Sequence, residues 1–150
     1  MLFNVALMLG TFLGMEAVAW LTHKYVMHGF MWRWHESHHR PRKGWWEVND
    51  WFALVFGLLS TAVIIVGNRV ESLGFLFWIG LGIALYGVFY TIFHDVIVHR
   101  RVKVRFKARH AYLQRIIRAH HVHHRVHTRN GAEAFGFLYA PKKYGAPAKQ

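Results

Sequence analysis

Three long stretches of this chain are almost purely apolar. Residues 2–21 contain one charged residue, Glu16, and residues 51–67 and 73–93 contain none. A helix needs roughly 17–25 predominantly apolar residues to cross the hydrocarbon core of a bilayer. The pattern therefore predicts three transmembrane helices over these ranges, with the second span near the lower limit of length.

The first apolar stretch lies where a secretory signal peptide would lie. It lacks a basic segment before the apolar run and a small-residue cleavage motif, and histidines suited to metal ligation follow it at once. We therefore expect residues 2–21 to be a retained helix.

Basic residues are concentrated outside the apolar stretches. Residues 68–72 form a short loop, so three crossings place residues 22–50 and 94–150 on one side of the membrane. These two segments hold five and thirteen of the nineteen Lys and Arg residues, and all thirteen His residues. By the positive-inside rule this face is cytoplasmic and the N-terminus lies outside.

The first of these segments is expected to lie along the membrane. Residues 29–49 contain four Trp residues, which favour the headgroup region, so they predict an interfacial segment. Pro41 should end the helix that carries His35, because the residue before a proline avoids the α region. Residues 42–44 would then form a turn.

The second segment predicts a connector, a helix and a tail. Residues 100–109 alternate basic and apolar residues as a surface connector, residues 111–127 predict an amphipathic helix, and residues 141–150 predict a flexible tail. The expected fold is one domain, residues 1–150. It is an all-α integral membrane protein with about three transmembrane helices plus interfacial and cytoplasmic helices, and with histidine-rich segments at 22–50 and 94–140.

Composition supports this class and excludes others. The chain of 150 residues is 54% hydrophobic, yet it carries a formal charge of +12, which indicates an integral membrane protein with a basic aqueous face. The absence of Cys excludes disulfides, thiolate metal sites and Cys nucleophiles. We expect the basic face to meet anionic lipid or an acidic electron-donor protein and not nucleic acid, because no nucleic-acid-binding motif accompanies it.

Ten of the thirteen histidines follow one pattern that occurs twice. Each copy reads H-x4-H and then H-x2-H-H. The first copy is His23, His28, His35, His38 and His39, and the second is His94, His99, His120, His123 and His124. Imidazole is the commonest protein metal ligand, and ten imidazoles suit two ions better than one, so the pattern predicts a dimetal site. The other three, His110, His121 and His127, are expected to be interfacial polar residues, although His127 shares the helical face of His120 and is a candidate to assist.

The spacing within each copy has a structural consequence. Residues i, i+3 and i+4 of a helix share one face, so each triplet can serve one centre or be divided between two adjacent centres. The i, i+5 pairs are about 140° apart on an ideal α-helix. We hypothesise a π-bulge, which absorbs one extra residue, at both pairs. Imidazole suits zinc, copper, iron and nickel alike, so the metal stays open at this point.

Few other polar side chains are available to orient the imidazoles. An acceptor for the outer ring nitrogen fixes the tautomer of a metal-ligating histidine. The candidates for this supporting role are Asp95, Glu16, Glu47, Asn49, Asp50 and His127. Glu16 is a functional candidate because a carboxylate within a span is costly, whereas Asp50 has an alternative role as the cap of the helix that starts near Trp51.

The chain resembles a known family in the residues around these histidines. The histidine pattern resembles that of the membrane-bound non-haem diiron oxygenases, the fatty acid hydroxylase superfamily, and more narrowly that of bacterial-type beta-carotene hydroxylases. The narrower resemblance is carried by the segments Glu-Val-Asn-Asp at 47–50 and Phe-Gly-Phe-Leu-Tyr-Ala-Pro at 135–141. The similar segments run from near the first residue to about residue 141.

The resemblance implies a reaction and its cofactors. Two iron ions, held by the ten patterned histidines, would activate O2 and hydroxylate β-ionone rings at C3, converting β-carotene to β-cryptoxanthin and zeaxanthin. Zinc could replace iron in a purified sample. The electrons would come from ferredoxin and its NAD(P)H-dependent reductase, since the chain has no nucleotide-binding fingerprint and no cysteines for an iron–sulfur cluster. We expect no bound flavin or haem, and the bacterial inner membrane as the location.

The carotenoid substrate would enter from the lipid bilayer. Trp20, Phe89, Tyr90 and Phe93 are candidates to line its channel, with helix packing or lipid contact as the alternative role. Another diiron reaction, such as ring C4 ketolation, fatty-acid hydroxylation or desaturation, is an alternative function. A non-enzymatic membrane metal-binding protein is a more remote alternative, because the expected ligands gather outside the bilayer and not along a path through it.

Overall fold

The computed structural model describes residues 1–41 and 44–145. Its elements are α1 (Leu2–Leu21), a π-helix (Thr22–Phe30), α2 (Trp32–His35), a 3₁₀-helix (Glu36–His39), α3 (Asp50–Arg69), a 3₁₀-helix (Glu71–Leu73), α4 (Phe75–Tyr90), a π-helix (Thr91–Val98), α5 (Ala111–His123) and a 3₁₀-helix (Lys142–Tyr144). The predicted all-α fold class is confirmed.

Three helical stretches are long and apolar enough to cross a membrane. They cover Leu2–Phe30, Asp50–Arg69 and Phe75–Val98. The first and third are longer than the apolar stretches in the sequence because each continues from an α-helix directly into a π-helix. Backbone groups in lipid must be satisfied within the chain, which is why apolar segments of this length form helices. The chain is a membrane protein.

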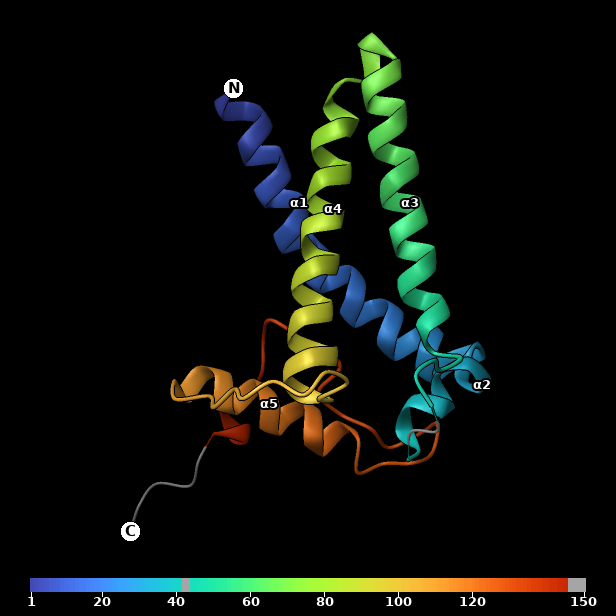
Figure 1. The fold of residues 1–150 in the computed structure, drawn as a ribbon, viewed down its shortest axis with the longest axis vertical. Coiled ribbons are helices and arrows are strands. Elements are labelled where there is room, and N and C mark those ends of the chain that lie inside the picture. The colour runs from blue at the N-terminus through green and yellow to red at the C-terminus, as the bar shows by residue number, and fades with distance from the viewer. Residues whose placement is uncertain (42–43, 146–150) are drawn as a thin grey trace.

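The spans form a bundle in which α4 packs against both α1 and α3. The N-terminus and the α3–α4 turn lie at one end of this bundle, and α2 and α5 lie at the other (Figure 1). Helix α5 runs across the base of α4, beneath the spans. All ten patterned histidines therefore lie at the end of the bundle opposite the N-terminus.

Two glycines of α4 allow its neighbours to approach closely. A Cβ at Gly80 would lie 2.5 Å from the Ile64 side chain and 2.9 Å from the Ile64 backbone nitrogen of α3. A Cβ at Gly82 would lie 2.6 Å from the Met8 carbonyl oxygen of α1. The Ser60 hydroxyl adds a hydrogen bond to the Gly80 carbonyl oxygen at 2.9 Å. Small residues and interhelical hydrogen bonds of this kind hold membrane helices together, because lipid provides no hydrophobic drive between them.

Two predictions about the C-terminal part are wrong. Helix α5 ends at His123 and does not continue to residue 127. Residues 141–145 are not a frayed tail, because Tyr144 is buried in a cluster with Ile116, Ala119 and Ala140, and the Arg118 side chain donates to its carbonyl oxygen at 2.8 Å. The rest of the predicted tail, 146–150, and residues 42–43 of the predicted turn lie outside the described residues.

The close approach at Gly80 predicts a defect that depends on position. We expect Gly80→Leu to separate α3 from α4 and lower the stability of the bundle by about 1–3 kcal/mol, the usual cost of overpacking. Thermal unfolding of the purified protein in detergent measures this. Gly10→Leu is the matched control, since a Cβ at Gly10 meets no atom within 4 Å. Equal stability of the two variants would show that the α3–α4 contact is not tight.

Candidate metal centre

Both H-x4-H pairs lie in or directly beside a π-helix. His23 and His28 are in Thr22–Phe30, and His94 and His99 span the end of Thr91–Val98. The backbone N–H of His99 donates to the His94 carbonyl oxygen at 2.8 Å, five residues earlier. The wider π turn brings residues i and i+5 onto the same side of the helix. The hypothesis of i→i−5 bonding is confirmed, and it extends over a whole segment and not over a single bulge.

The ten histidines gather into two clusters of five. The first cluster is His23, His28, His35, His39 and His123, and the second cluster is His38, His94, His99, His120 and His124. Within each cluster one nitrogen of every ring lies within 4.8 Å of the others. Each H-x2-H-H triplet is divided between the two clusters, which decides between the two arrangements that the spacing allows.

The Nε2 atoms of the rings point at one another. In the first cluster His23 meets His35 at 3.0 Å, His28 meets both His39 and His123 at 3.2 Å, and His39 meets His35 at 3.1 Å. In the second cluster His38 meets His94 at 2.8 Å and His99 meets His120 at 2.9 Å. Two ligands bound at right angles about 2.1 Å from one ion would be roughly 3 Å apart.

The opposite nitrogens of the first cluster each face a neutral acceptor. The Nδ1 atoms of His23, His28, His39 and His123 face the backbone carbonyl oxygens of Phe135, Arg129, Val126 and Glu133 at 3.0, 3.0, 2.7 and 2.8 Å. His35 Nδ1 faces Asn49 Oδ1 at 2.7 Å. A carbonyl oxygen only accepts, so each of these Nδ1 atoms must carry the ring proton and donate.

Two rings of the second cluster face carboxylates. His38 Nδ1 donates to Glu47 Oε2 at 3.0 Å, and His94 Nδ1 donates to Asp95 Oδ1 at 2.7 Å. Arg101 joins these two acids to Asp50, through contacts of 3.2 Å to Glu47, 2.7 Å to Asp50 and 3.7 Å to Asp95. A guanidinium in this position fixes the direction of several carboxylates at once.

These hydrogen bonds make the clusters compatible with a metal site. In the seven rings whose Nδ1 faces an acceptor, Nδ1 holds the ring proton. The Nε2 atoms of these rings therefore present bare lone pairs to each other at hydrogen-bond distance with no proton between them. A cation at the centre removes that repulsion. His124 Nε2 is in addition buried without a hydrogen-bond partner among the described residues, and a metal ion would satisfy it.

Burial keeps the imidazoles in the form that binds metal. It lowers the pKa of His39 to about 4 and that of His123 to about 3, and it lowers the pKa values of His35, His38 and His120 well below their usual range. The cause is loss of hydration, which disfavours the charged ring, and neighbouring imidazoles add to it. The rings are therefore neutral at neutral pH, as metal ligation requires.

The segment after α5 covers both clusters. Glu133 and Phe135 supply carbonyl oxygens to the first cluster. The Phe137 ring packs against His94 of the second cluster and against Tyr90, with centroid distances of 5.3 and 4.4 Å. The position of this segment therefore helps to orient imidazole rings in both clusters.

Glu16 holds this covering segment and not an imidazole, which corrects the prediction for it. Its Oε1 accepts from the backbone N–H groups of Phe137, Leu138 and Tyr139 at 2.7, 2.8 and 3.2 Å. Its Oε2 accepts from the Tyr86 hydroxyl at 2.8 Å. Four donors on one carboxylate explain how a charge is tolerated at this depth in a span.

Of the other predicted supporting residues, three orient imidazoles and two do not. Asn49, Glu47 and Asp95 accept from imidazoles, as described above. Asp50 accepts from the Glu47 backbone N–H at 3.0 Å and pairs with Arg101. His127 is exposed and belongs to neither cluster, because α5 ends before it and the helical face that it was expected to share does not extend that far.

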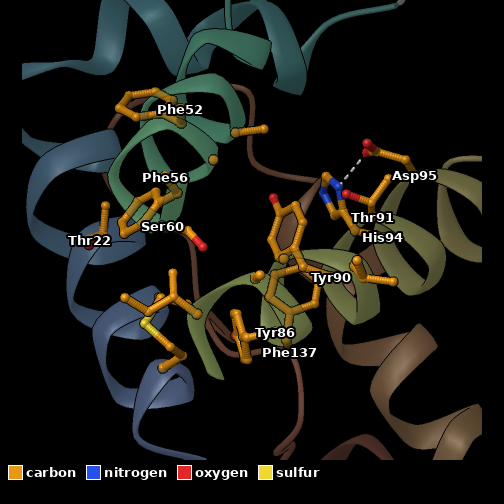
Figure 2. A pocket seen from close by; sticks show the side chains of 18 of the residues that line it. Thr22, Phe52, Phe56, Ser60, Tyr86, Tyr90, Thr91, His94, Asp95 and Phe137 are labelled. Carbon is orange, nitrogen blue, oxygen red and sulfur yellow. Dashed lines mark hydrogen bonds and ion pairs between the residues drawn. The ribbon is translucent and has the colours of Figure 1, made fainter. Parts of the chain in front are cut away.

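An apolar cavity of about 580 Å³ lies among α1, α3 and α4 and reaches both clusters. Figure 2 shows Phe52, Phe56 and Ser60 of α3 across from Tyr86 and Tyr90 of α4. Lining residues at one end of it include His23 and His35 of the first cluster and His94 of the second.

Only one of the four predicted channel residues, Tyr90, lines this cavity. Trp20 packs against Phe135, and Phe89 packs against Phe12. Phe93 packs against the buried cluster around Ile116. Aromatic character alone could not separate these roles, because lipid contact, helix packing and cavity lining all favour the same side chains.

Sequence reasoning missed Arg101 and the carbonyl oxygens of residues 126–135. Arg101 lies among exposed basic residues of the 100–109 connector, so nothing local distinguishes it from a surface charge. Backbone acceptors carry no side-chain signal at all. The resemblance of residues 135–141 to a family segment was the one indication that this region belongs to the site.

Comparisons with known proteins identify the family of the chain. The fatty acid hydroxylase family model matches residues 8–140, and the chain belongs to that family. It is 46% identical over 140 residues to a beta-carotene hydroxylase of Pantoea ananas, covering 93% of this chain and 79% of the relative. It is also 46% identical over 142 residues to a beta-carotene hydroxylase of Pseudescherichia vulneris, covering 95% of this chain and 80% of the relative.

A plant relative is more distant. The chain is 38% identical over 143 residues to beta-carotene 3-hydroxylase 1, chloroplastic, of Arabidopsis thaliana, covering 92% of this chain and 44% of the relative. No solved structure matches the chain. Family membership makes the protein an oxidoreductase of the hydroxylase type.

The contacts of Glu16 predict that its removal loosens the covering segment. We expect Glu16→Ala to raise hydrogen exchange at the amides of residues 137–139 and to lower stability by at least about 2 kcal/mol, since hydrogen bonds to a charged group contribute about 1.5–3 kcal/mol each. Hydrogen–deuterium exchange and thermal unfolding measure the two effects.

Glu36→Ala is the control, because among the described residues Glu36 pairs with the exposed Arg40, a type of contact that contributes about 0–1 kcal/mol. Unchanged exchange at residues 137–139 in Glu16→Ala would contradict the anchoring role.

Proposed function

We propose that this protein is a beta-carotene hydroxylase that hydroxylates β-ionone rings at C3. The observation that carries the proposal is an apolar cavity among membrane-spanning helices that reaches two clusters of five buried or half-buried histidines. The similarity to beta-carotene hydroxylases over more than nine-tenths of the chain supports the substrate class, and the name of the plant relative supports position 3.

Each histidine cluster would hold one iron ion through the Nε2 atoms that converge in it. Bound iron supplies the capacity to activate O2 with two electrons. In the overall reaction one oxygen atom of O2 is inserted into a ring C–H bond to give C–OH. The other oxygen atom takes up the two electrons and two protons and leaves as water. Zinc fits the same imidazole donors, so a purified sample could contain it in place of iron.

The chain itself positions the ring and excludes water. A hydrocarbon offers no group for acid–base catalysis, so selectivity for one carbon must come from the shape of the cavity. Phe52, Phe56 and Tyr90 provide apolar walls near the histidines. A ring held against His23, His35 and His94 would lie next to both metal positions.

The polyene would enter this cavity from the bilayer, between the spans. By the positive-inside rule, the histidine-rich face lies on the cytoplasmic side of the bacterial inner membrane, and the N-terminus lies on the opposite, outer side. Reduced ferredoxin, kept reduced by an NAD(P)H-dependent reductase, would donate electrons at this basic face. We expect no contact with nucleic acid.

The proposed function predicts which histidine matters for pigment formation. Bacteria that make β-carotene should accumulate zeaxanthin when they express this chain and keep β-carotene when they express His123→Ala, since His123 belongs to the first cluster. Pigment analysis by chromatography measures this. His121→Ala is the matched control on the same helix, because His121 is exposed and belongs to neither cluster, and it should still give zeaxanthin.

Other pigment outcomes have definite meanings. Canthaxanthin from the wild type would make the protein a ring C4 ketolase. Unmodified β-carotene from a well-expressed wild type would direct the search to fatty-acyl or sterol substrates.

The cavity predicts a variant that blocks substrate and leaves the metal in place. Gly57 of α3 lines the cavity, and a Cβ there meets no atom within 4 Å. We expect Gly57→Phe to reduce hydroxylation at least tenfold with unchanged metal content, because the ring occupies the substrate's space. Product formation and elemental analysis measure the two quantities. Gly10→Phe adds the same side chain at an open position outside the lining residues, and equal activity of both variants would rule out this cavity as the substrate site.

A further inference from the structure

The two clusters differ in the charge of the groups that orient their rings. All five Nδ1 acceptors of the first cluster are neutral: four are backbone carbonyl oxygens and the fifth is the Asn49 amide oxygen. In the second cluster, His38 and His94 instead donate to the carboxylates of Glu47 and Asp95.

The carboxylates beside the second cluster are well shielded from solvent. The side chains of Glu47, Asp50 and Asp95 are 8, 13 and 20% exposed, and that of Arg101 is 12% exposed. Among the described residues, the Arg101 guanidinium faces these three carboxylates. Glu47 and Asp95 place their carboxylates directly behind imidazoles of the second cluster, and screening by salt is weaker for partly buried charges.

This difference changes how strongly each cluster attracts a cation. A carboxylate that accepts from Nδ1–H makes the opposite Nε2 a stronger donor to metal than a neutral amide does. The negative charge also attracts the ion directly, and attraction between charges is larger in a partly dry site than in water. Both effects favour the second cluster.

We infer that the two metal positions are unequal, with the second cluster holding its ion more tightly because Glu47 and Asp95 stand behind His38 and His94. The inference rests on the proposed two-metal function. Glu47 and Asp95 are positioning residues, since they act through the imidazoles. Arg101 keeps both carboxylates directed at the rings, because Glu47 Oε2 and Asp95 Oδ1 each contact a histidine and the guanidinium.

Stepwise metal removal tests this inference. The full-length protein in detergent is loaded with Zn²⁺, dialysed against rising concentrations of chelator, and assayed for zinc per chain by mass spectrometry. We expect the wild type to lose its two equivalents in two separate steps. Asp95→Asn and Glu47→Gln keep an acceptor oxygen and remove the charge, so each should move the later step to a chelator concentration about 10–100-fold lower and leave the earlier step unchanged.

The reciprocal variant places a charge behind the other cluster. Asn49→Asp is isosteric and should move the earlier step to higher chelator concentration, because His35 then donates to a carboxylate. A merely structural role for these residues would not shift opposite steps in opposite directions. Size-exclusion chromatography and circular dichroism check that each variant is folded, and any one of the three variants that folds suffices for the test.

The failures of this inference and of the proposed function can be told apart. Two equivalents that leave the wild type in a single step, or variants at Glu47 and Asp95 that move the earlier step, would overturn the inequality and leave the two-metal function standing. A folded wild type that binds fewer than two zinc ions would overturn both.

Discussion

The structure depends on where the ten imidazoles of the two clusters keep their protons. Seven of them face an acceptor through Nδ1, and this hydrogen bond forces the bare Nε2 lone pair inward. Without a cation, such a convergence of lone pairs is unfavourable, and without the acceptors the rings could turn and bond to each other. The outer hydrogen bonds therefore decide that each cluster presents metal ligands and not a network of mutually satisfied histidines.

This requirement explains the path of the chain after α5. Residues 126–135 contain no patterned histidine, yet four of their carbonyl oxygens face rings of the first cluster. The backbone carbonyl oxygens of such an irregular segment are not used in helix or sheet hydrogen bonds, and here they accept from the imidazoles. Glu16 then ties the next residues to α1 through three backbone N–H groups. A carboxylate that looks out of place in an apolar span is thus a link between the membrane bundle and the cover of the metal centre.

The fold and the site differ in how far the sequence could predict them. The spans were predictable because lipid leaves no alternative to a helix for a long apolar segment, and the i, i+5 spacing indicated π-helical turns because an α-helix would have separated the two rings. Division of His35, His38 and His39 between two clusters was not predictable, since periodicity describes one helix and cluster membership depends on how several helices cross. The roles of Arg101 and Glu16 and the end of α5 at His123 were not predictable for the same reason. They depend on contacts with segments that are distant in sequence.

The relation between the cavity and the clusters bears on how two metal positions would work together. Residues of both clusters line the same end of one apolar space: His23 and His35 from the first and His94 from the second. If only one ion reacted and the other were structural, one cluster could lie away from the cavity without loss. Under the proposed function, a C–H bond without activating groups must be positioned by shape alone, and a cavity that reaches both clusters would place a ring beside both metal positions. The geometry therefore fits a proposal in which both metal positions lie beside one substrate better than one in which a metal position is remote from it.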